Sequence, residues 1–299
     1  MAHPLSRWIV LLAAAAPVAG AAILLSLPAA LLMAGVLAGL VVALMRRTPP
    51  IPRPAVVLSE IFVGVSIGAV ASGELFLAFA KDWPFMLVAL AGTLAAAFAS
   101  GQVLRWNPNV TLGTSLLASI PGGAVGVIAA SDRPYVNLPV VSAVQYARVV
   151  VLVFTLPLAA RMFGGEPQPG AHRPFVTELL SGWGGSQLLF TAIVLAASLL
   201  VHRFVRFSSS TIIISMTLAA ALATTGLIPS PGVPGAILNI AYFVIGANIG
   251  QKFTRESLRV VVATLPLVAL YIALAVAGGL LLPLLISRML GVPVLDAFL

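Results

Sequence analysis

The 299-residue sequence contains no cysteine, and charged residues make up only 8% of it. Disulfide bonds and thiolate metal sites are therefore excluded. The three histidines (His3, His172 and His202) do not have metal-ligand spacing, so no metal site is expected. The sequence also lacks a nucleotide-binding glycine loop, a nucleophile elbow and a catalytic carboxylate pair. We therefore expect neither enzymatic activity nor a cofactor.

Hydrophobic residues make up 61% of the chain, and long apolar runs recur along its whole length. This composition predicts an all-α polytopic membrane protein, with no stretch suited to a sizeable soluble domain. The first run resembles a cleaved signal peptide, but its counterpart in the second half favours a retained helix. About nine transmembrane helices are predicted, over residues 8–25, 27–45, 55–73, 83–104, 136–160, 187–205, 210–228, 234–251 and 259–285.

The net charge of +8 could indicate a nucleic-acid partner. The basic residues, however, occur in ones to threes between apolar runs, without interleaved aromatic residues. Cationic loops that hold membrane helices in their orientation explain this pattern better. The lipid bilayer is therefore the expected partner, and nucleic acid is not.

Two stretches of the chain repeat each other at an offset of 182 positions. Prolines and glycines in register are backbone punctuation, so they are stronger evidence of duplication than matching apolar residues. Internal duplication is typical of secondary transporters. The matched pairs are Pro49/Pro231, Pro52/Pro234, Gly64/Gly246, Ile67/Ile249, Gly68/Gly250, Glu74/Glu256 and Pro84/Pro266.

The basic residues predict the topology, if the N-terminus is cytoplasmic. Residues 111–133 form two short apolar pieces, which either cross as a broken helix or return to their own side. A re-entrant segment leaves eleven basic residues inside and four outside, whereas a crossing segment leaves eight and seven. The positive-inside rule thus favours re-entry. Equivalent loops of the two copies then have opposite charge, as expected for inverted-topology repeats.

The repeats define the predicted domains. The first membrane repeat covers residues 1–163, a linker covers 164–186, and the second repeat covers 187–299. The second repeat is incomplete at its C-terminal end, because it stops where the first continues into its hinge. A truncated reading frame is one explanation, and a natural short form is the other. We expect the chain to be inactive alone or to fill the gap as a homodimer.

Arg148 is the strongest candidate site residue, because it lies near the centre of a predicted spanning helix. A charge at that depth is costly unless it is paired or hydrated. Gln145 lies one turn earlier on the same face. The pair could bind an anionic or carboxylate-bearing solute. Alternatively, Arg148 could form a structural ion pair with Glu60.

The hinge Pro121-Gly122-Gly123 breaks the apolar segment 111–133. Helix breaks within a membrane expose backbone groups, and two half-helix ends can form an ion or anion site. The alternative is a re-entrant turn needed only for packing. Glu60 could be a proton or cation site, a partner of Arg148, or an interfacial carboxylate.

Three glycine pairs with a spacing of four (Gly35/Gly39, Gly64/Gly68 and Gly246/Gly250) predict close helix packing. Ser66 and Asn248 are polar and occupy equivalent positions inside two of these pairs. They would face each other if the two repeats meet at a site in the middle of the membrane. We therefore include both among the candidate solute-binding residues.

The sequence SIPGGAVGVIAASD, followed by a Gln-x-x-Arg element and Leu-Pro (119–157), resembles the hinge of the membrane AbrB family. The stretch LPAALL (27–32) and the elements VGVSIG and IGANIG also fit. The resemblance implies a duplicated membrane protein. Family members are often labelled transcriptional regulators or ammonia monooxygenases. The second label does not fit a chain with three peripheral histidines.

Together these features predict an inner-membrane secondary transporter or exporter of a small, perhaps anionic, solute. The alternative is a membrane protein that regulates gene expression without transport. Buried polar groups at a helix break favour transport, whereas regulation would be favoured by a large cytoplasmic domain, which the sequence lacks.

Overall fold

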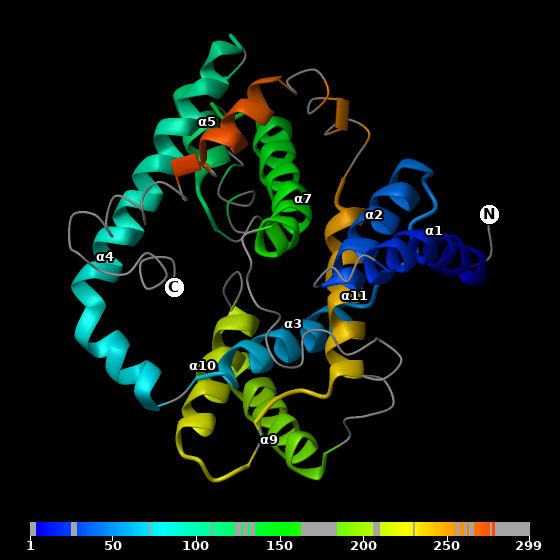
Figure 1. Cartoon of the computed structure of the whole chain (residues 1–299). Helices are drawn as coiled ribbons and strands as arrows, with labels where there is room; N and C mark the ends of the chain where they lie inside the picture. The colour runs from blue at the N-terminus through cyan, green and yellow to red at the C-terminus, as the bar shows by residue number, and fades with distance from the viewer. Residues whose placement is uncertain are drawn as a thin grey trace. The chain divides into compact units, whose positions relative to one another are not determined.

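A computed structural model gives the fold of the chain (Figure 1). It describes residues 4–24, 29–71, 73–108, 110–122, 135–162, 184–205, 210–229, 231–253 and 266–275, together with residues 127, 131, 255, 258–259, 262 and 277–278. Within these ranges every regular element is a helix, and no strand occurs.

The helices follow one another along the chain with short connections. They are α1 (Pro4–Leu24), α2 (Ala30–Leu44), α3 (Arg53–Gly68), α4 (Gly73–Gly101), the 3₁₀ helix η1 (Gln102–Trp106), α5 (Leu112–Ser119), α7 (Leu138–Met162), α9 (Gly185–His202), α10 (Ser210–Thr224) and α11 (Gly235–Gln251). One more apolar helix covers Pro266–Ala275.

Four helical ranges are long and apolar enough to cross a membrane: Ser6–Leu24, Met86–Trp106, Leu138–Thr155 and Gly185–His202. Each overlaps one of the nine predicted spans. Helices α2, α10, α11 and Pro266–Ala275 are apolar but shorter than predicted. A 15-residue helix such as α2 is only about 22 Å long, against a hydrocarbon core of about 30 Å. Nine transmembrane helices therefore remain a prediction.

Proline sets the start of two equivalent helices. Pro52 is the N-cap of α3 and Pro234 is the N-cap of α11, and both have extended backbone. Proline has no N–H to donate, so it interrupts a helix on one side and is tolerated at the start of the next. The proline matches found in the sequence therefore mark the same structural position in both copies.

The chain folds into two compact units, and neither unit is continuous in sequence. Unit 1 comprises Met1–Phe76 and Val149–Thr254, and unit 2 comprises Leu77–Arg148 and Arg255–Leu299. Unit 1 contains α1 to α3 and α9 to α11, which are the first three helices of each predicted repeat. Each unit thus takes corresponding parts of both repeats.

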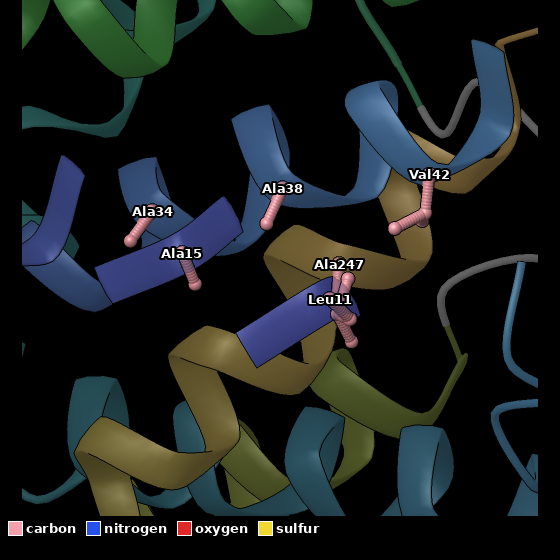
Figure 2. Packing of buried hydrophobic residues seen from close by; sticks show 6 residues of the cluster. All are labelled: Leu11, Ala15, Ala34, Ala38, Val42 and Ala247. Atoms are coloured by element: carbon pink, nitrogen blue, oxygen red, sulfur yellow. The ribbon is translucent and has the colours of Figure 1, made fainter. Parts of the chain in front are cut away.

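Two apolar cores hold unit 1 together. In the first, Leu11 and Ala15 of α1 pack with residues of α2 and with Ala247 of α11 (Figure 2). In the second, residues of α9 pack with Ile61 and Val65 of α3 and with Ala219 of α10. The second core combines α9, α10 and α3 as the first combines α1, α2 and α11. Exchanging the two repeats therefore converts one core into the other.

Glycine lets α11 approach α2 closely. A Cβ atom added at Gly246 would clash with the carbonyl oxygen of Leu32. One added at Gly250 would clash with the carbonyl oxygen of Val36 and lie 2.7 Å from the amide nitrogen of Leu40. A side chain at either position would separate the two backbones, as expected for glycine pairs with this spacing.

Helix α3 approaches α10 in the same way. A Cβ atom at Gly64 would lie 2.7 Å from the carbonyl oxygen of Ile212. One at Gly68 would clash with the carbonyl oxygen of Met216 and lie 2.9 Å from the amide nitrogen of Ala220. The prediction that these glycines mediate close packing is confirmed, and the contacts match those of α11 with α2.

Large apolar side chains lie exposed along the helices of both halves of the chain, including Ile9, Leu12, Leu24, Leu189, Leu200 and Ile240. Exposed apolar surface of this extent needs an apolar environment or a partner. Together with the four long apolar helices, this surface points to lipid as the surrounding medium.

Candidate functional site

The hinge segment begins with a half-helix, α5, in unit 2. Thr111 caps this helix, because its hydroxyl accepts a hydrogen bond from the amide of Thr114 at 3.2 Å. Eight residues at 1.5 Å each give a length of about 12 Å, so α5 cannot cross a bilayer alone. It ends at Ser119, and Ile120 has extended backbone, as expected for a residue that precedes proline.

The chain returns to the start of α5 after the hinge. The Thr111 hydroxyl donates to the carbonyl oxygen of Tyr135 at 2.9 Å. The amide of Asn137 donates to the hydroxyl of Thr114 at 3.0 Å. Residues on both sides of the hinge are thus hydrogen-bonded to each other at the N-terminal end of α5.

Gln145 holds the other end of α5. Its side chain is fully buried. Its amide nitrogen Nε2 donates to the carbonyl oxygens of Leu117 at 3.0 Å, Ala118 at 3.3 Å and Ile120 at 3.1 Å. The last carbonyl groups of a helix have no partner within the helix itself. Gln145 supplies those partners where the hinge stops α5.

Arg148 reaches the same carbonyl groups from the next turn of α7. Its Nη2 donates to Ile120 O at 3.1 Å and to Gln145 Oε1 at 2.7 Å, and its Nη1 donates to Ser119 O at 3.4 Å. A cation at a helix C-terminus is favourable, because the carbonyl groups there carry partial negative charge. The structure therefore assigns Arg148 a capping role that the sequence did not predict.

Tyr271 completes the set of Arg148 partners. Its hydroxyl accepts a hydrogen bond from Arg148 Nη1 at 3.3 Å, and its side chain is fully buried. Tyr271 belongs to the helix Pro266–Ala275, in the second predicted repeat. Sequence reasoning missed this residue, although a tyrosine inside an apolar run is a signal of a buried polar contact.

The hinge residues lie beside this group. Pro121 and Gly122 are exposed. Gly123, the third predicted hinge residue, lies outside the described residues. The exposed backbone at Pro121 and Gly122 directly follows Ile120, whose carbonyl oxygen both Gln145 and Arg148 bind. The predicted grouping of hinge, glutamine and arginine is therefore present for the residues that the structure describes.

Glu60 has a different set of partners, all in unit 1. The hydroxyl of Thr211 hydrogen-bonds its carboxylate, and Lys252 and His202 interact with it electrostatically. Within the described part of the chain, the hydrogen bonds of Arg148 go to backbone oxygens, Gln145 and Tyr271 instead. The alternative in which Arg148 pairs with Glu60 is not what the described contacts contain.

Lys252 lies one residue beyond α11. Burial lowers the pKa of its ammonium group, and the nearby Glu60 carboxylate raises it. The lysine is thus held partly out of water beside a carboxylate, an arrangement whose charge depends on the state of both groups.

Ser66 and Asn248 lie on α3 and α11, and these two helices pack against each other. Both side chains are partly buried. No hydrogen bond joins them in the described part of the chain. Their role in solute binding stays a prediction. The same residues hold no group of three histidines, cysteines or acids that could bind a metal ion.

Where it is described, the chain is helical throughout, with four helices long and apolar enough to span a membrane and a half-helix capped by buried polar side chains. These are the features of an α-helical membrane protein. The chain belongs to the AbrB family, because residues 31–299 match the family model described as "Transition state regulatory protein AbrB". The family resemblance seen in the hinge sequence is thus confirmed.

Two curated proteins illustrate the relationship. The chain is 27% identical over 259 residues to "Putative regulator AbrB" of Escherichia coli (strain K12), covering 85% of this chain and 72% of that protein. It is 29% identical over 100 residues to "Uncharacterized protein YhjN" of Bacillus subtilis (strain 168), covering 33% of this chain and 26% of that protein. No solved structure matches the chain.

Proposed function

We propose that this chain is a secondary transporter of a small anionic solute in the inner (plasma) membrane, without catalytic activity. One observation carries the proposal. A half-helix ends at a proline beside a buried glutamine and a partly buried arginine, inside a chain that is otherwise strongly apolar. Transporters place their solute sites at such discontinuous helices, where half-helix ends supply binding groups.

Inverted repeats are part of this proposal, and the glycine contacts support them. Gly64 and Gly68 correspond to Gly246 and Gly250 at the offset of 182. Their contacts also correspond, since Ile212, Met216 and Ala220 each lie 180 positions after Leu32, Val36 and Leu40. Within unit 2, a Cβ atom at Gly278 would lie 3.0 Å from Cβ of Ala96, its equivalent at the offset of 182. Contacts that match in this way are expected from two copies related by a two-fold axis.

Re-entry of the hinge segment is supported by the bonds from Thr111 to Tyr135 and from Asn137 to Thr114. A segment that crossed the bilayer would place its two ends about 30 Å apart. Hydrogen bonds between the two ends fit a segment that enters and leaves on one side. The positive-inside pattern favours the same arrangement.

The anionic character of the solute follows from Arg148. Its guanidinium carries a full positive charge, against roughly half an elementary charge of opposite sign at the end of a helix. The capped half-helix thus keeps a net positive charge in apolar surroundings. A small carboxylate bound beside Pro121 and Gly122 would neutralise it and could use the exposed backbone there.

Regulation of gene expression without transport is the second candidate, and the printed name of the Escherichia coli relative favours it. The two proposals differ in one measurable property. A transporter moves solute across a bilayer as a purified protein, whereas a regulator of this kind needs a further partner to act.

The test uses purified chain reconstituted into liposomes that are loaded with labelled mono- and dicarboxylates. We expect counterflow of at least one carboxylate, reduced about tenfold or more by Arg148→Gln, which removes the charge but can keep some hydrogen bonds. Arg105→Gln is the matched control, because Arg105 is exposed and bonds only Gln102 among the described residues. Absence of counterflow across the panel, or equal counterflow in the Arg148→Gln protein, contradicts the proposal.

A further inference from the structure

Four helices of unit 1 bring ionisable and polar side chains together away from the hinge. Glu60 comes from α3, His202 from the last turn of α9, Thr211 from the first turn of α10, and Lys252 from the residue after α11. We call these four residues the Glu60 cluster. None of them contacts the capped half-helix, which belongs to unit 2.

The cluster contains a directional chain of hydrogen bonds. Thr211 Oγ1 lies 3.4 Å from His202 Nδ1, and the Thr211 hydroxyl also hydrogen-bonds the Glu60 carboxylate. A threonine hydroxyl has one proton and two acceptor lone pairs. It can donate that proton to the carboxylate only while it accepts from the imidazole N–H. The chain therefore leads from His202 through Thr211 to Glu60.

Buried polar atoms without a partner lie next to this chain in sequence. Ser198 Oγ, Ser210 Oγ and Gln251 Nε2 have no hydrogen-bond partner among the described residues. Ser198 is one helical turn before His202 and so shares its face of α9. Ser210 and Gln251 directly precede Thr211 and Lys252. Buried polar groups of this kind are costly unless water or a bound species satisfies them.

The charges of the cluster select the species. On the helices that pack against α3, the groups facing Glu60 are His202 of α9, Thr211 of α10 and Lys252 after α11. Lys252 and a charged imidazole would repel a metal cation, and Glu60 would repel an anion. A proton is different, because it neutralises Glu60 without placing a second charge beside Lys252.

We propose that Glu60 is the proton-binding group of this protein, which His202 and Thr211 connect to solvent and which couples solute movement to the proton gradient. The proposal rests on the transport function proposed above. In the unprotonated state Glu60 is balanced by Lys252, and protonation releases the lysine. Uptake or release of one proton thus changes the attraction between α3 and the end of α11.

The test is a pH titration of the full chain in lipid nanodiscs, followed by infrared difference spectroscopy of the protonated carboxyl band. It is run between about pH 4 and about pH 9, to cover carboxyl and imidazole titration. We expect one pH-dependent band from a buried carboxyl group, lost in Glu60→Gln. Glu166→Gln, the same chemical change in the predicted linker, is the matched control and retains it.

Thr211→Val keeps the proposal testable if the Glu60→Gln protein does not fold. Loss of the hydroxyl removes a hydrogen bond to the charged carboxylate, so the midpoint of the band moves to higher pH by about one unit. A band that persists in Glu60→Gln, or a midpoint that Thr211→Val leaves unchanged, overturns the proposal. The titration needs no solute. A protein that titrates as expected but transports nothing refutes the transport function, not the proton site.

Discussion

Thr111 and Tyr135 lie 24 residues apart in sequence and are joined by a hydrogen bond of 2.9 Å from the Thr111 hydroxyl to the Tyr135 carbonyl oxygen. Between them the chain forms α5 and the Pro-Gly hinge. The bond fixes the two ends of this segment at one level of unit 2. It therefore links a local contact to the topology of the whole chain.

The first prediction is that Trp106 and Tyr135 are both reached from the cytoplasmic side, and Leu227 from the opposite side. All three side chains are exposed. Because the chain has no cysteine, single substitutions Trp106→Cys, Tyr135→Cys and Leu227→Cys can be labelled without background. We expect a membrane-impermeant maleimide to label the first two in inverted vesicles and the third in right-side-out vesicles. Labelling of 106 and 135 from opposite sides would contradict re-entry.

The second prediction concerns Thr111. Thr111→Val removes both the cap of α5 and the bond to Tyr135, and we expect a loss of about 1–2 kcal/mol in unfolding free energy. Thr155→Val is the control, because the Thr155 hydroxyl bonds only Val151 of its own helix in the described structure. Thermal melting in detergent measures both variants. Equal melting temperatures would show that the hinge contact adds no stability.

The third prediction concerns Arg148 as a cap. Arg148→Ala leaves the carbonyl groups of Ser119 and Ile120 with fewer partners, so we expect a loss of about 2 kcal/mol or more. Arg148→Lys should recover only part of this loss, because one ammonium group cannot reach two carbonyls, Gln145 and Tyr271 together. Thermal melting compares these variants with the exposed Arg105→Ala. Full stability of Arg148→Ala would rule out the capping role.

The fourth prediction concerns the close helix contacts. Gly64→Ala and Gly246→Ala each force a Cβ atom against the neighbouring helix, and we expect each to cost about 1–3 kcal/mol. Gly20→Ala has open space around it and should be neutral or stabilising, since alanine favours helix. Membrane abundance and melting temperature are the measurements. A loss at only one of the paired positions would weaken the two-fold relationship.

The sequence predicted the hinge group well, because its signals are local. Pro121 breaks a helix for steric reasons that need no tertiary information. Gln145 and Arg148 are one turn apart, so they share a helix face wherever that helix lies. Polar groups deep in an apolar run also demand partners, and here the partners are the carbonyl groups that the proline leaves unbonded.

The remaining contacts depend on helix packing that composition does not encode. Tyr271 is 123 residues from Arg148, and periodicity gives no reason to join them. The partners of Glu60 come from three other helices, so pairing it with Arg148 was only one of several options. Helix lengths were overestimated because hydropathy continues past the residues where backbone geometry ends a helix, as at Ala29 before α2, whose φ is 56°.

The notch formed by Gly246 and Gly250 against α2 also restricts movement. A slide of one or two residues along the axis would bring bulky side chains to the positions that glycine now keeps open. The next matching arrangement lies one turn away, about 6 Å along the helix. Helices α2 and α11 therefore move together as one body, or shift by a whole turn in a single step.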